Sequence, residues 1–214
     1  MVLSRMELDL SKRETMMALA APSRLHGAVE QAFSGERKRN LWRLDTLRGR
    51  QYLLLLSEER PDLTRAAEQF GFPDRDPAWE SRDYLPFLQR IGPGTRWHFR
   101  LTANPTISRK RDGKRGKVYA HITPGHQKEW LLKKSEKRGF SLEEDSFDVV
   151  RSCWQRFSRK GERTVSILSV TYEGILTVTD PELLRASLIE GIGRGKAYGM
   201  GLMTLVRIQE QDHG

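Results

Sequence analysis

The stretch LWRLDTLRGRQYLLLLS, from Leu41 to Ser57, determines how the first part of the chain folds. Its two apolar runs, 41–47 and 51–57, lie on either side of Arg48-Gly49. Two such runs around a short glycine turn predict a β-hairpin. The segments on either side of this hairpin give the element order of the first domain.

Before the hairpin, the sequence predicts a strand and a helix. Residues 1–8 alternate loosely between apolar and polar types, as a strand does. Pro22 suits the first position of a helix, and Leu25, Val29 and Phe33 then form one apolar stripe. After the hairpin, a second helix over 61–70 and a last strand over 84–91 complete the order β-α-β-β-α-β.

The second half of the chain repeats this order with an added hairpin before its first helix. Ile91-Gly-Pro-Gly94 is the expected linker. The predicted elements are strands over 97–103 and 118–122, a helix from 123 to 139, strands over 147–157 and 164–179, a helix from 180 to 191, and a strand over 202–208. The sequence therefore predicts an α+β fold of two tandem ferredoxin-like (RRM-like) domains, 1–92 and 95–214. Because this scaffold serves many tasks besides RNA recognition, function must be argued from sites.

Composition narrows the possible partners. The 214 residues carry a net charge of +9, which favours polyanions, above all nucleic acid. No apolar stretch approaches the roughly 18–20 residues of a membrane span. Arg5, Glu7 and Asp9 stand where a signal peptide needs an apolar core, so we expect a cytoplasmic protein. Cys153 is the single cysteine, which excludes an internal disulfide and a thiolate zinc cage.

A glycine-rich segment between the last helix and the last strand is the clearest motif. It reads GIGRGKAYGMG over residues 191–201, with Arg194 and Lys196 among its five glycines. Such a backbone can approach a phosphate closely and form an anion-binding nest. Ala197 stands where a Walker motif needs Ser or Thr, and the order helix-loop-strand is the reverse of a dinucleotide fingerprint. A long flexible turn is the alternative.

Two further turns concentrate positive charge. Six of the nine residues in 109–117 are basic, and a second cluster surrounds the turn after 157. Basic hairpin tips can follow a phosphate backbone, although solvated loops can look the same. The candidate RNA-binding residues in these turns are Arg109, Lys110, Arg111, Lys114, Arg115, Arg156, Arg159 and Lys160.

Among the five histidines, only His26 has a placement that suits proton transfer. None of the five has a second ligand at a zinc-type spacing, so neither a metal nor a small-molecule cofactor is expected. His26 lies one turn into the first predicted helix, on the flank of its apolar stripe and two residues after Arg24. A histidine near cations can act on a phosphate ester. From spacing alone, however, a structural histidine is the more common interpretation, and spacing does not identify a nuclease.

Taken together, these segments resemble the CasE-type endoribonucleases of type I-E CRISPR systems, members of the RAMP superfamily. The resemblance covers nearly the whole chain. Its most specific part is GIGRGKAYGMGLMTL, residues 191–205, which is similar to the family's glycine-rich loop and following strand. WHFRLTANP at 97–105, QKEWL at 127–131, TYEG at 171–174 and the Leu25-His26 pair also follow family order.

The resemblance implies a metal-independent endoribonuclease. Such a protein cuts the repeat hairpin of CRISPR precursor RNA by attack of a 2′-hydroxyl, which gives a 2′,3′-cyclic phosphate. It then keeps the mature guide RNA and joins the other subunits of the Cascade complex. The catalytic histidine falls on His26, while Arg24 and Lys160 are candidates for stabilising charge. Ser23, Gly193, Arg194, Gly195 and Lys196 are then expected to bind RNA.

One position departs from the family pattern. Family members often carry a tyrosine three residues before the histidine, where this chain has Ser23. A serine hydroxyl reaches less far and is a weaker acid. The alternative function is therefore a non-cleaving subunit that only holds the RNA hairpin; an RNA-binding protein unrelated to CRISPR is a third possibility.

Overall fold

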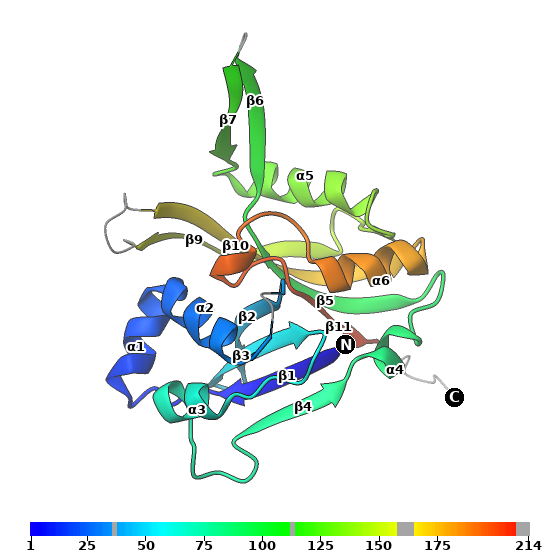
Figure 1. Cartoon of the computed structure of the whole chain (residues 1–214). Helices are drawn as coiled ribbons and strands as arrows, with labels where there is room; N and C mark the ends of the chain where they lie inside the picture. Colours follow the sequence, from blue (N-terminus) through cyan, green and yellow to red (C-terminus); the bar gives the residue numbers. More distant parts are fainter. Residues whose placement is uncertain (36–37, 112–113, 158–164, 209–214) are drawn as a thin grey trace.

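The computed structural model describes residues 1–35, 38–111, 114–157 and 165–208, with the backbone alone for 109–111, 114–116 and 157. Two antiparallel sheets, one from each half of the chain, form its framework (Figure 1). Within the described residues, no helix combines the length and the apolarity needed to cross a membrane.

The first sheet has the strand order β2-β3-β1-β4. Its strands are β1 (Val2–Glu7), β2 (Leu41–Leu47), β3 (Arg50–Ser57) and β4 (Trp79–Asp83). Helices α1 (Arg13–Ala20), α2 (Pro22–Gln31) and α3 (Thr64–Phe70) belong to the same half. This order, with all pairs antiparallel, is the ferredoxin-like arrangement predicted from the sequence.

The second sheet repeats the arrangement as β11-β5-β10, with β8 and β9 both paired to β10. Its strands are β5 (Arg96–Ala103), β8 (Phe140–Ser141), β9 (Phe147–Phe157), β10 (Val165–Val178) and β11 (Met203–Arg207). Two helices, α5 (Pro124–Ser135) and α6 (Pro181–Glu190), connect them. The α+β fold of two ferredoxin-like units is therefore confirmed.

The added hairpin, β6 (Thr106–Arg111) with β7 (Lys114–Ala120), stands away from the rest of the molecule (Figure 1). The sequence predicted a strand over 118–122 after a basic turn. In the structure the paired ribbon is longer and includes the basic residues themselves, because Arg109 pairs with Lys117 and Arg111 with Lys114.

The predicted last strand of the first half was wrong. Residues 84–91 are not a strand but contain the short helix α4 (Leu85–Leu88), where Pro86 lies in the first turn and Asp83 Oδ1 accepts the Leu85 N–H. The last strand is instead β4, an edge strand that pairs with β1 alone. Its half-exposed sequence WESRD lacks the apolar pattern of a central strand.

The hydrophobic core has two parts. One lies within the first half, where α2 and α3 pack on the sheet through residues such as Leu25, Val29 and Phe70. The other joins both halves, because Leu41, Leu54 and Leu56 of the first sheet belong to the same cluster as the buried residues of the second. The two sheets are thus packed against each other, and sites can form where they meet.

Candidate active site

A pocket of about 620 Å³ opens where α2 faces the glycine-rich loop. The first half contributes His26 and Glu30 from α2 and the segment 38–40 that leads into β2. The second half contributes residues 193–197. Neither half of the chain forms this pocket alone.

His26 reaches the pocket because of its place on α2. Leu25 and Val29 are fully buried against the sheet, and His26 follows Leu25 on the flank of that stripe. Its side chain is 22% exposed, so water and a ligand can reach the ring. Glu30, one turn later, places Oε1 3.9 Å from His26 Nδ1. At this distance the two side chains can form an ion pair when the imidazole carries a proton.

The opposite side of the pocket is strongly cationic. Arg39 and Arg194 are exposed, whereas Lys196 is half-buried. Burial, followed by the charges of Arg39 and Arg138, lowers the pKa of the Lys196 ammonium. Lys38 contributes less, because Glu58 and Glu59 hold its ammonium at 3.1 and 2.6 Å. A histidine that shares a pocket with several cations is an arrangement that suits a phosphodiester.

Packing and backbone conformation explain the glycines of the loop. Gly195 and Gly199 are left-handed residues on either side of the short 3₁₀ helix η1 (Lys196–Tyr198). A Cβ on Gly199 would lie 2.7 Å from the Trp42 ring, and one on Gly191 would lie 2.8 Å from Leu41. The loop therefore packs closely against β2.

The structure brings some of the sequence-predicted site residues together. His26, Gly193, Arg194, Gly195 and Lys196 line the same pocket. Ser23 and Arg24, in the first turn of α2, are not among its lining residues, and Arg24 is exposed. The two candidates Arg159 and Lys160 lie outside the described residues, as do the side chains of Arg109, Lys110, Arg111, Lys114 and Arg115.

Arg156 lies elsewhere, as an exposed residue of β9 that pairs with Ser166 of β10. Four polar residues of the pocket were missed by the sequence analysis: Glu30, Lys38, Arg39 and Asn40. Glu30 could have been found from its i, i+4 spacing to His26. No local signal marks the other three, which reach the pocket only because β2 approaches the glycine-rich loop.

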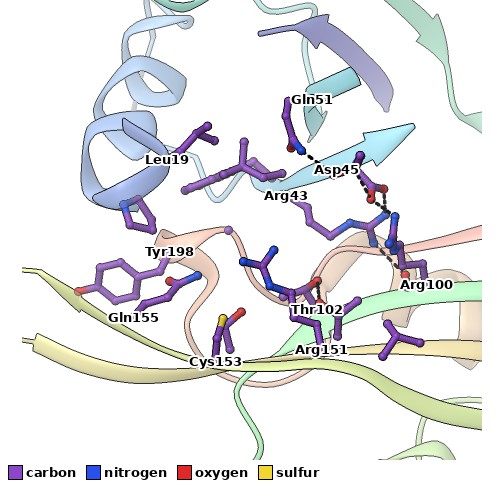
Figure 2. Close-up of a pocket in the computed structure, with 18 of the residues that line it drawn as sticks. Leu19, Arg43, Asp45, Gln51, Arg100, Thr102, Arg151, Cys153, Gln155 and Tyr198 are labelled. Atoms are coloured by element: carbon purple, nitrogen blue, oxygen red, sulfur yellow. Dashed lines mark hydrogen bonds and ion pairs between the residues drawn. The ribbon is translucent and has the colours of Figure 1, made fainter. Parts of the chain in front are cut away.

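A second pocket, of about 560 Å³, lies between the two sheets. At its end, Arg43, Asp45 and Arg100 point toward one another (Figure 2). Asp45 accepts from both arginines, and Arg100 also pairs with Glu173 at 2.5 Å. Burial lowers the pKa of Arg43, and the Asp45 carboxylate opposes that shift.

The chain belongs to the family of CRISPR associated proteins, whose family model matches residues 1–207. It is 33% identical over 222 residues to the CRISPR-associated endoribonuclease Cse3 of Thermus thermophilus, covering 96% of this chain and 99% of that relative. It is also 32% identical over 120 residues to the Cascade subunit CasE of Escherichia coli, covering 52% of this chain and 58% of CasE.

The fold of this chain is also similar to that of a solved Cse3 structure. The structure of Cse3 bound to a 19-nucleotide RNA has a TM-score of 0.81 and 29% identity, covering 96% of this chain and all of that one. The resemblance to CasE-type proteins that the sequence motifs indicated is confirmed.

Proposed function

We propose that this protein is an endoribonuclease that cuts the repeat hairpins of CRISPR precursor RNA to produce mature guide RNA. The observation that carries this proposal is the pocket in which His26 faces Arg39, Arg194 and Lys196. The relative named as an endoribonuclease aligns with nearly the whole of both chains, which supports the same activity here.

The proposed reaction is a transesterification within the RNA. The 2′-oxygen beside the cut bonds to phosphorus, the bond from phosphorus to the 5′-oxygen breaks, and a proton passes from the former oxygen to the latter. His26 serves as the acid or the base in this transfer, which is worth about 10²–10⁴-fold in rate. The products are a 2′,3′-cyclic phosphate and a 5′-hydroxyl.

Positive charge near the phosphate supplies the second part of the catalysis. Charge builds up on the phosphoryl oxygens as the 2′-oxygen attacks, and a preorganised cation stabilises it. Lys196 is the best-placed residue because it is half-buried and lines the same pocket as His26. Arg24 and Lys160 remain proposed contributors, Arg24 from its place two residues before His26.

RNA binding is proposed to extend well beyond this pocket. The hairpin β6–β7 stands away from the body of the molecule and carries the basic run 109–117, which suits contact with the backbone of an RNA stem. Arg156, near the end of β9, is proposed to contact the same RNA, as are Ser23 and Arg159.

The relatives also support a proposal about the complex into which this chain assembles. We propose that the chain remains bound to its guide RNA in the cytoplasm as a subunit of Cascade. The CasE relative is named as a Cascade subunit, which supports the assembly. We also propose the domain division 1–92 and 95–214, which is supported because every described strand pairs within its own half.

The alternative function is a non-cleaving subunit, since Ser23 replaces the tyrosine often found in the family.

A cleavage assay on the cognate repeat hairpin, with EDTA present, tests this proposal. We expect one cut, with a cyclic phosphate on the 5′ fragment. A hairpin with a single 2′-deoxynucleotide at the cut should bind equally well and stay intact, because it lacks the attacking oxygen. Binding of both RNAs without any cutting would instead establish the non-cleaving alternative.

A further inference from the structure

Arg43 joins the two halves of the molecule at a point where almost no water reaches. It belongs to β2 of the first sheet, and its side chain is 1% exposed. One nitrogen, Nη1, donates to the carbonyls of Arg100 and Leu202 at 2.8 and 2.9 Å. The other, Nη2, donates to Asp45 Oδ2 at 2.6 Å and Thr204 Oγ1 at 2.8 Å.

Three of these four acceptors belong to the second half of the chain. Arg100 lies on β5, Thr204 lies on β11, and Leu202 directly follows the last glycine of the glycine-rich loop. The same end of the loop is also held by the Gly201 N–H, which donates to the carbonyl of Thr102 at 2.7 Å. Arg43 therefore holds the end of the loop to β2.

The neighbours of Arg43 on β2 hold the rest of the loop. The Trp42 ring packs against Gly199, and the Leu41 side chain packs against Gly191. Just before them, the segment 38–40 lines the candidate active site opposite residues 193–197. The start of β2 and the glycine-rich loop thus form one continuous contact between the two halves.

We propose that Arg43 is a positioning residue that fixes the glycine-rich loop relative to α2, so that Lys196 and His26 can contact the same phosphate. This inference rests on the proposed function, because it concerns the site of that reaction. Arg43 does not line the pocket of His26, and it touches no reacting atom.

Arginine is the residue type that this task requires. Its planar guanidinium directs several N–H groups at fixed angles, whereas a lysine ammonium is a point charge on a flexible stem. The buried charge is compensated by Asp45, whose second oxygen accepts from Arg100. Removing Arg43 leaves several acceptors between the sheets without their donor, and the sheets can then shift relative to each other.

Arg185 provides a matched control. It also spans the two halves, since its Nε donates to the Leu88 carbonyl at 2.9 Å and its Nη2 donates to the Ile91 carbonyl at 2.6 Å. It lies on α6, however, and is absent from the pocket of His26. Loss of Arg185 should therefore cost stability without moving the loop relative to α2.

The test compares Arg43→Met with Arg185→Met in the full chain, with two readouts. The first is the single-turnover cleavage rate at saturating protein, together with Kd for the hairpin that carries the 2′-deoxynucleotide. The second is the distance between spin labels at Gln31→Cys and Ile189→Cys in a Cys153→Ser background, measured without RNA. Both labelled positions are exposed, one at the end of α2 and one near the end of α6.

For Arg43→Met we expect a shifted or broadened distance and a rate reduced by about 10- to 100-fold, because a misplacement of about 1 Å can cost about 100-fold. Its Kd should change by less than about threefold, since the basic surfaces remain intact. Arg185→Met should lower the melting temperature but keep the parent's distance and rate. If Arg43→Met does not fold, Thr204→Val removes one acceptor and should show a smaller change in the same direction.

Three results would overturn the proposal: an unchanged distance, an unchanged rate, or equal loss of rate in both variants in proportion to their lost stability. A parent chain that binds RNA but never cuts it would refute the proposed function instead. In that case, a distance that changes only in Arg43→Met would still support the positioning role of Arg43.

Discussion

At the scale of single residues, Lys196 has the most informative environment. The folded chain disfavours its charge, mainly through burial and then through Arg39 and Arg138, so its pKa lies below the usual 10.5. A phosphate in the pocket would reverse that balance, because its negative charge favours the ammonium. The charged form of Lys196 is therefore stabilised most strongly when RNA is bound.

This environment predicts a pH dependence of cleavage. If Lys196 must be charged, kcat/KM should fall as pH rises through its lowered pKa, earlier than for an ordinary lysine. Lys196→Arg should retain activity over that range, because arginine stays protonated. An identical alkaline decline in both proteins would contradict the role of Lys196. Rates are corrected for cleavage of the RNA without protein.

Loss of folding stability caused by titration of Lys196 cannot explain this decline in activity. Because its pKa is lower in the folded chain than in the unfolded chain, its charge costs stability below that pKa. The cost disappears as pH rises from the folded value toward 10.5. This group therefore makes the fold more stable in the range where activity is expected to fall.

Only part of the site could be predicted at this scale. The stripe of Leu25 and Val29 placed His26 on the flank of a helix, and the family resemblance supplied its catalytic role. Arg39 could not be found, because it reaches the site through the contact between β2 and a loop about 150 residues later in the chain. No local pattern encodes such a contact.

At the scale of elements, the glycine-rich loop packs closely on β2. We predict that Gly199→Ala will lower the free energy of unfolding by about 1–3 kcal/mol. Its φ is +76°, and the added Cβ would lie 2.7 Å from the Trp42 ring. Urea unfolding measures the change.

Gly27→Ala is the control for this prediction. Gly27 lies within α2, and a Cβ there meets nothing within 4 Å. Alanine favours a helix over glycine by about 1 kcal/mol, so this variant should be as stable as the parent or more stable. Equal stability of Gly199→Ala and the parent would show that the loop adapts freely.

The elements themselves were predicted to different degrees. The hairpin β2–β3 and the helix that starts at Pro22 were found because apolar periodicity and turn residues mark them clearly. Helix α1 was missed, and β4 was placed too late, because an edge strand with an exposed face has too few apolar residues to stand out. Leu88 is buried within α4, and the buried Tyr84 directly precedes that helix, so apolar content alone cannot distinguish such a segment from a strand.

At the scale of the whole molecule, the net charge of +9 is expected to dominate the affinity for RNA. Arg156→Ala should weaken binding of the repeat hairpin and reduce the slope of log K against log salt by about 1, because one phosphate contact is lost. Arg65 is an exposed residue of α3 in the other half, and Arg65→Ala removes the same charge but should leave the slope unchanged. Equal slopes for all three proteins would remove Arg156 from the interface.

The packing of the two sheets, by contrast, could not be predicted from the sequence. The repeated element order indicated two similar units, but nothing in it showed that Leu41 and Leu54 would share a core with the second sheet. The buried Arg43 looks like an ordinary polar residue of an alternating strand until its acceptors on β5 and β11 are known. The candidate site depends on the relative position of the two halves. That position is set by contacts between residues far apart in the sequence, which local patterns do not reveal.

The central claim is that His26 transfers a proton during RNA cleavage. The most direct measurement compares the single-turnover cleavage rate of the parent with that of His26→Ala on the cognate repeat hairpin in EDTA, with Kd measured in parallel. We expect the variant to bind within about threefold of the parent and to cut at least about 100-fold more slowly. A variant that cuts as fast as the parent would contradict the account and place the chemistry elsewhere.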